Sequence, residues 1–174
     1  GQMLAMISLP FFLQGALGRS DVTTGLLLTP WPLATMIMAP LAGRLVERIH
    51  AGILGGIGMT IFATGLFLLA ILPDTDIIWR LFICGAGFGL FQTPNNSTII
   101  SSAPSNRSGG ASGMLGTARL LGQTLGATLV AMIFNLVPNN STQACLYLAT
   151  GFAVVAAIIS SLRISQPRPL KGFK

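Results

Sequence analysis

The sequence predicts an all-α membrane protein with six transmembrane helices, and two observations support this fold class. Of its 174 residues, 52% are hydrophobic and only 8% are charged, and the mean hydropathy is +0.75, whereas soluble domains carry about 25% charged residues. Charged side chains are also missing from four long runs, 22–43, 51–73, 81–106 and 120–162. Each run can supply the ~20 residues of one spanning helix, and the last can supply two.

Apolar stretches and polar turns place the helices at 1–17, 22–45, 51–73, 77–102, 108–136 and 142–163. In this prediction residues 1–164 form one bundle, and 165–174, with two prolines, form a disordered cytoplasmic tail. The first helix is apolar from its first residue and has no polar leader. We therefore expect that helix to be truncated and the chain to be the C-terminal part of a longer protein.

Two helix starts and one helix interior have distinctive residues. Asp21 is expected to cap the second helix, with Ser20 as the alternative. Thr29-Pro30-Trp31-Pro32 removes two backbone donors near the middle of that helix, so the helix is expected to bend or unwind there. Interrupted hydrophobic segments point to transporter binding sites, and a kink that serves packing alone is the alternative. At the fourth helix, Asp76 is expected to act as the cap and Arg80 to extend back to the membrane surface.

The charged residues indicate orientation rather than a charged partner. The net charge is +6, but basic side chains stand singly at helix ends. We therefore expect the chain to contact the lipid bilayer and not to bind nucleic acid. If the chain crosses the membrane six times, most basic residues and the C-terminus lie on the same side. By the positive-inside rule this side is the cytoplasm. That side holds Arg44, Arg48, Arg107, Arg163, Arg168, Lys171 and Lys174, and the other holds Arg19 and Arg80.

Residues 85–126 combine glycines with polar side chains at membrane depth. Spacings such as Gly85-xxx-Gly89 and Gly109-xxx-Gly113 predict close approach of helices. The polar side chains, which are costly in a membrane and therefore indicate function, are Gln92, Asn95, Asn96, Arg119 and Gln123. At 100° per residue, Gln92 and Asn96 share one face of the fourth helix, and Arg119 and Gln123 share one face of the fifth. We expect these faces to line a central cavity, with Gln92, Asn96 and Gln123 hydrogen-bonding substrate or water. Hydrogen bonds between helices are the alternative.

Several motifs carry a resemblance to a known family. Gly43-Arg44-x-x-Glu47-Arg48, after the second helix, resembles the loop motif of major facilitator transporters. The passage from Leu13-Gln14-Gly15 to Thr29-Pro30, together with Arg119-x-x-Gly122-x-x-x-Gly126, resembles the EmrB/QacA-like drug:proton antiporters. Within that family the likeness is to fourteen-helix exporters of quaternary ammonium compounds and methyl viologen. The resemblance implies the C-terminal half of a major facilitator fold, a 3+3 inverted repeat.

The resemblance also implies a function and a set of site residues. The chain would be part of a multidrug exporter of the bacterial inner membrane, which exchanges hydrophobic and cationic compounds for protons and needs a missing N-terminal half. The expected substrate-binding residues are Gln14, Trp31, Gln92, Asn95, Asn96, Arg119 and Gln123. Arg119 would repel a cation, so it is expected to reach toward the cytoplasm or to pair with an acid of the missing half. The expected gating loop is Gly43, Arg44, Glu47 and Arg48, whose ion pairs would form in one access state and break in the other. Plain positive-inside anchoring is the alternative.

The remaining reactive residues limit the chemistry. All four acidic residues lie in loops or at helix ends, so the proton-coupling acid is expected in the missing part. Cys84 and Cys145 lie in apolar runs without metal-ligand spacing and are expected to be small apolar fillers. With one histidine and no nucleophile–base pair, no enzyme, cofactor or metal is expected. A non-transporting membrane scaffold or assembly subunit is the alternative function, and the polar groups at membrane depth count against it.

Overall fold

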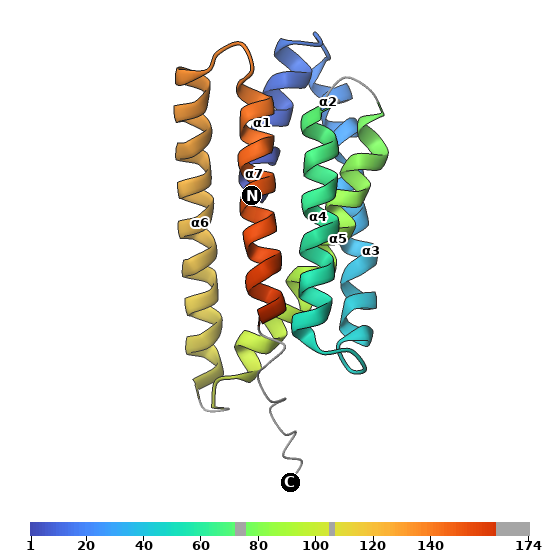
Figure 1. Cartoon of the computed structure of the whole chain (residues 1–174), viewed down its shortest axis with the longest axis vertical. Coiled ribbons are helices and arrows are strands. Elements are labelled where there is room, and N and C mark those ends of the chain that lie inside the picture. Colours follow the sequence, from blue (N-terminus) through green and yellow to red (C-terminus); the bar gives the residue numbers. More distant parts are fainter. Residues whose placement is uncertain (72–75, 105–106, 163–174) are drawn as a thin grey trace.

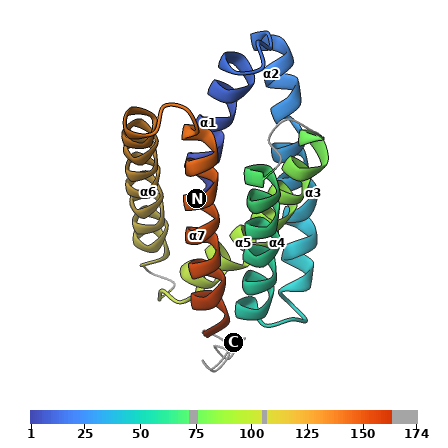
Figure 2. The same cartoon turned by 45° about the horizontal axis from the view of Figure 1, so that its top comes forward.

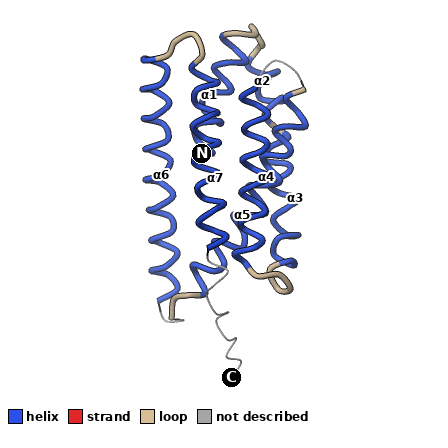
Figure 3. The backbone as a smooth tube through the Cα atoms, viewed as in Figure 1, coloured by secondary structure: helices blue, strands red, loops and turns tan. Residues whose placement is uncertain are grey.

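The computed structural model describes residues 1–71, 76–104 and 107–162, and every regular element in these ranges is a helix (Figures 1 and 3). The helices are α1 Gln2–Gly15, α2 Asp21–Leu28, α3 Pro30–Leu45, α4 Ala51–Ile71, α5 Ile77–Ser101, α6 Ser108–Leu136 and α7 Ser141–Leu162. Among the described residues, four segments could cross a membrane by length and composition: α2 and α3 together (Asp21–Leu45), α4, α6 and α7. α1 is shorter, and α5 is 25 residues long but carries polar side chains inside it. The all-α fold class is therefore confirmed. The predicted tail, 165–174, lies outside the described residues.

The second predicted helix is built as two helices that meet at Thr29. The prediction that Asp21 caps it is wrong, because Asp21 is the first helical residue and the Ser20 hydroxyl accepts from the Thr23 backbone N–H at 3.3 Å. Thr29 keeps helical angles, φ −56° and ψ −33°, and its hydroxyl donates to the Gly25 carbonyl at 2.9 Å. Pro30 then opens α3 at the position where a missing N–H costs least. The segment Asp21–Leu45 is therefore divided into two helices at Thr29, but its backbone is not unwound there.

α5 lies between α3 and α4, and its glycines set how closely the three helices approach (Figure 2). Toward α4, a Cβ built on Gly87 would lie 2.7 Å from the carbonyl oxygen of Gly58, so the two backbones are in direct contact. Toward α3, a Cβ on Gly89 would lie 3.1 Å from the carbonyl oxygen of Thr35. The close approach predicted from the glycines of this helix is confirmed, and it is the packing that joins helices in a bilayer.

α6 stands at the edge of the bundle and is exposed along most of its length (Figure 1). Within the described chain it buries Gly126 and Val130 alone. A Cβ on Gly126 would lie 2.9 Å from Met3 of α1, so α6 leans on α1 at this point. The predicted close packing is not seen at the other glycines of the helix, since an added Cβ would meet no described atom within 4 Å. These are Gly109, Gly110, Gly113, Gly116 and Gly122.

The two ends of the bundle separate the basic residues. The α3–α4 turn, the start of α6 and the last residues of α7 lie at one end of the bundle, and the α1–α2 and α6–α7 connections lie at the opposite end (Figure 1). Arg44, Arg48 and Arg107 therefore share one end, as six crossings predict. Asp74 and the four basic residues after Leu162 lie outside the described residues.

Two expectations at the start of α5 are wrong. Asp76 is the N-cap residue, but its side chain makes no capping hydrogen bond, because its backbone has φ 48° instead of the extended conformation that capping needs. Arg80 does not extend to the membrane surface. Its side chain is 3% exposed, and its guanidinium carbon lies 5.2 Å from the centroid of the Trp79 ring. This is the distance of a cation–π contact.

Candidate functional site

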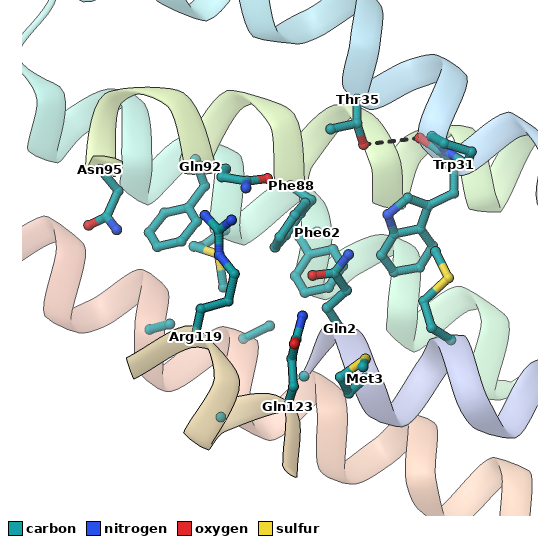
Figure 4. Close-up of a pocket in the computed structure, with 18 of the residues that line it drawn as sticks. Gln2, Met3, Trp31, Thr35, Phe62, Phe88, Gln92, Asn95, Arg119 and Gln123 are labelled. Carbon is teal, nitrogen blue, oxygen red and sulfur yellow. Dashed lines mark hydrogen bonds between the residues drawn. The ribbon is translucent and has the colours of Figure 1, made fainter. Parts of the chain in front are cut away.

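A cavity of about 1140 Å³ lies between α1, α3, α5 and α6, with further side chains from α4 and α7 (Figure 4). This is slightly larger than the roughly 300–1,000 Å³ of pockets that hold drug-sized molecules, so a molecule of that size has room in it. Segments distant in the sequence meet here because α5 crosses the bundle in contact with both α3 and α4. The half-buried amides in its wall are Gln2, Gln92, Asn95, Asn96 and Gln123.

Aromatic rings form one side of the cavity. The rings of Trp31 and Phe62 meet edge to face, with centroids 5.6 Å apart and an interplanar angle of 82°. Phe88 of α5 continues this cluster, with its centroid 5.7 Å from that of Phe62. Phe91 and Phe152 also line the cavity. Such pairs stabilise a fixed arrangement of rings. Trp31 and Phe62 are each 2% exposed, so the half-buried rings of Phe88 and Phe91 are the ones that a ligand can contact.

Trp31 is held in place by the contact between α3 and α5. The Thr35 hydroxyl lies 3.0 Å from the carbonyl oxygens of both Trp31 and Gly85, and it can donate to either (Figure 4). Gly85 allows this because an added Cβ would collide with the Trp31 carbonyl. The indole itself is 2% exposed, and its Nε1 has no hydrogen-bond partner among the described residues. A buried donor left in this state costs about 1–3 kcal/mol.

Two neighbouring helices supply the polar side of the cavity. α5 contributes Gln92, Asn95 and Asn96 within little more than one turn, and all three are half-buried. α6 contributes Arg119 and Gln123, which are one turn apart and therefore share a face. Figure 4 shows the Arg119 side chain extending from α6 into the cavity toward Gln92. At 1.5 Å per residue, Gln92 lies about 14 Å from the C-terminal end of α5 and Arg119 about 17 Å from the N-terminal end of α6, close to the middle of a ~30 Å membrane core. By the same measure Asn96 lies about 8 Å and Gln123 about 23 Å from those ends.

The structure brings six of the seven expected substrate-binding residues to this cavity. They are Trp31, Gln92, Asn95, Asn96, Arg119 and Gln123. Gln14 is exposed near the end of α1 and does not line the cavity. Their contact with a substrate stays a prediction.

Sequence reasoning missed Gln2, which lines the cavity and points toward Gln123 (Figure 4). Both Gln2 and Gln14 are amides in an apolar helix, but at 100° per residue their directions differ by about 120°. A helical wheel that also used the buried positions of α1, such as Leu9 and Leu13, would have separated the two.

The expected gating residues lie together at one end of the bundle, away from the cavity. Gly43 and Arg44 are in the last turns of α3, and Glu47 and Arg48 are in the turn before α4. The side chains of Arg44, Glu47 and Arg48 are exposed. Arg44 is placed where a cation interacts favourably with the C-terminal end of a helix. The ion-pair network and its gating role stay predictions.

The described residues offer no cluster of three or more metal-ligating side chains. Cys84 and Cys145 are free thiols, both buried in the bundle core. Cys84 lies against Gly65, where an added Cβ would come within 2.6 Å of its sulfur. Both cysteines therefore pack as small apolar side chains, as expected.

Comparison with known proteins identifies the family. The sequence pattern of the family described as Major Facilitator Superfamily matches residues 1–174. The chain belongs to the major facilitator superfamily. The resemblance that the motifs indicated is thus confirmed. The cavity therefore lies in a helical bundle of a protein family whose members are transporters.

Individual relatives within the superfamily include drug transporters. The chain is 66% identical over 171 residues, 96% of its length, to the uncharacterized transporter YebQ of Escherichia coli K12, of which it covers 37%. It is 31% identical over 70% of its length to the multidrug resistance protein Stp of Mycobacterium tuberculosis, covering 23% of that protein. It is 28% identical over 89% of its length to the quinolone resistance protein NorB of Staphylococcus aureus, covering 36%. The chain thus spans between 23% and 37% of the length of these relatives.

Proposed function

We propose that this chain is a substrate-binding C-terminal part of a secondary multidrug exporter. The observation that carries the proposal is the cavity itself, in which aromatic rings face amides at mid-membrane depth. Its relatives Stp and NorB are named for resistance to drugs, and a rigid aromatic wall with a few polar groups suits varied hydrophobic substrates. Because this chain spans only part of the length of those proteins, we propose that transport also requires the remaining residues of the full-length transporter.

We propose proton-coupled antiport as the energy source, with the coupling acid outside this chain. Asp21, Glu47 and Asp76 lie at helix ends, and none of them lines the cavity. A carboxyl that exchanges protons with a mid-membrane site has to lie near that site. The rest of the full-length transporter is therefore the proposed source of this group, as the resemblance implies.

We propose that the transporter lies in the bacterial inner membrane with the Arg44, Arg48 and Arg107 end in the cytoplasm. The accumulation of arginines at that end supports this orientation by the positive-inside rule. The gating loop would then face the cytoplasm, where it can close one access path. The cationic substrates implied by the resemblance are disfavoured by Arg119, so the proposal is restricted to hydrophobic compounds.

The test replaces cavity amides in the full-length transporter. Gln92→Leu, Asn96→Leu and Gln123→Leu each remove hydrogen-bonding groups while keeping a similar volume. Since a hydrogen bond contributes about 1 kcal/mol net, each variant is expected to weaken the binding of a hydrogen-bonding drug about fivefold and to lower resistance. Binding to purified protein and resistance in cells are both measured, with expression checked.

Gln14→Leu is the matched control, because it makes the same change on an exposed face of α1 outside the cavity. It is expected to leave drug affinity unchanged. Unaltered affinity and resistance in all three cavity variants would remove the amides from the binding site and leave them as groups that join helices.

A further inference from the structure

The cavity carries a net positive charge in the part of the protein described here. Arg119 is the one charged side chain among its lining residues. Three of the four acidic residues of the chain lie elsewhere, at helix ends, and Asp74 is outside the described residues. Arginine stays protonated at any physiological pH. An anionic group that enters this cavity therefore meets an attractive charge, and a cationic group meets a repulsive one.

Arg119 is placed to bind an anion inside the cavity. Its guanidinium extends toward Gln92 of α5 (Figure 4), and Gln123 lies one turn away on the same helix. A guanidinium presents parallel N–H donors that fit the two oxygens of a carboxylate. The amide NH₂ groups of Gln92 and Gln123 can donate to the same oxygens, so the polar side of the cavity is rich in donors.

The apolar side of the cavity defines the rest of the ligand. Trp31, Phe62 and Phe88 form a contiguous cluster of rings, and methionines 3, 6, 36 and 59 lie among the other lining residues. Rings and thioethers bind planar aromatic molecules well. The cavity therefore combines an apolar side, on which Phe88 is the half-buried ring of this cluster, with one positively charged side.

We propose that Arg119 determines specificity, so that the cavity prefers planar aromatic carboxylates over uncharged or cationic molecules of the same shape. This inference rests on the proposed function, because it assigns the substrate class of the same cavity. The competing explanation is that Arg119 forms an ion pair with a carboxylate elsewhere in the full-length transporter. In that case its charge is neutralised and the charge of a ligand has little effect on binding.

The experiment compares three ligands that share one ring system. They are 2-naphthoate, 2-naphthamide and (2-naphthyl)trimethylammonium, and their dissociation constants for the purified full-length transporter are measured by calorimetry at pH 7. The wild type is expected to bind naphthoate about tenfold more tightly than naphthamide, which corresponds to about 1.4 kcal/mol. The ammonium compound is expected to bind most weakly. Equal binding of all three by the wild type would refute the inference and leave the proposed function intact.

Variants at position 119 test whether the charge of Arg119 causes the preference for naphthoate over naphthamide. Arg119→Gln is expected to weaken naphthoate binding about tenfold and to leave naphthamide binding unchanged, which also shows that the variant is folded. Arg119→Lys keeps the charge without the paired donors and is expected to retain part of the preference. Arg107→Gln, at the exposed α5–α6 turn, is the matched control and should retain all of it.

Two results would contradict the assignment in different ways. An unchanged ratio of naphthoate to naphthamide affinity in Arg119→Gln would show that another group selects the charge. If none of the three ligands bound the wild type, the cavity would not be a substrate site of this kind, and the proposed function would fail with the inference.

Discussion

Replacing Gly87 with alanine is expected to destabilise the bundle, because the added methyl group has no space between α4 and α5. The Cβ would lie 2.7 Å from the carbonyl oxygen of Gly58 and 2.9 Å from the Cα of Phe62, and closer still to the backbone nitrogen of Phe62. Ordinary contacts of a Cβ begin at 3.4 Å. All three atoms belong to the α4 backbone, so relief requires the whole helix to move by roughly 0.5–1 Å instead of a side-chain rotation.

The magnitude follows from two opposing terms. Overpacking of this kind costs about 1–3 kcal/mol. In the other direction, replacing glycine with alanine inside a helix stabilises the helix by up to about 1 kcal/mol, because alanine has the higher helix propensity. With the full gain, the net loss is about 0–2 kcal/mol, which lowers Tm by up to roughly 8 °C on the scale of domains of this size, while the difference from a glycine-to-alanine exchange without the contact is the full 1–3 kcal/mol. The same displacement would disturb Phe62 and Phe88 in the cavity wall, so drug binding is expected to weaken as well.

Gly151→Ala in α7 is the control, since Gly151 is exposed and an added Cβ would meet no described atom within 4 Å. It makes the same chemical change in a helix without the contact, and it is expected to leave Tm unchanged or raised. Thermal unfolding of the full-length transporter is followed by fluorescence-detected size-exclusion chromatography in detergent. Equal Tm values for the two variants, or a lower Tm for Gly151→Ala, would refute the reasoning.

Two further predictions concern the ends of the bundle. A single cysteine at Arg107 is expected to resist a membrane-impermeant thiol reagent on intact cells without an outer membrane, while one at Asn139 is labelled, because these exposed positions lie at opposite ends; the reverse pattern would overturn the topology. Arg44→Ala and Glu47→Ala are expected to slow transport severalfold with little effect on drug affinity, because a gate biases states without touching the ligand. Reduced affinity with normal turnover would argue against a gate.

The helices were largely predictable because each needs only its local sequence. The run at 51–73 becomes α4 at Ala51–Ile71, and 108–136 becomes α6 with the same bounds. In a bilayer every backbone polar group has to be satisfied within the segment, so a long uncharged apolar run is nearly always a helix. Local geometry at the helix starts was harder, since Ser20 and Asp21 are both good caps and the backbone angles decide between them.

The cavity-lining residues were predictable where the polar pattern was periodic. Gln92 and Asn96 on α5, and Arg119 and Gln123 on α6, share helical faces that a wheel identifies. Isolated polar residues gave no such pattern. A polar pattern therefore could not distinguish Gln14, which is exposed and does not line the cavity, from Gln2, which does line it.

The sequence by itself determined that this protein is a membrane-embedded helical bundle with costly polar groups on two of its helices. These properties are local, because solvation by lipid acts on each segment separately. Only the tertiary structure decided which helices meet and where a cavity remains between them. That outcome depends on contacts between residues far apart in the sequence, such as Gly58 with Gly87 and Thr35 with Gly85. A glycine pattern permits close approach on many faces, and the fit of the neighbouring helix selects one: α5 uses its glycines against α3 and α4, whereas α6 uses Gly126 alone.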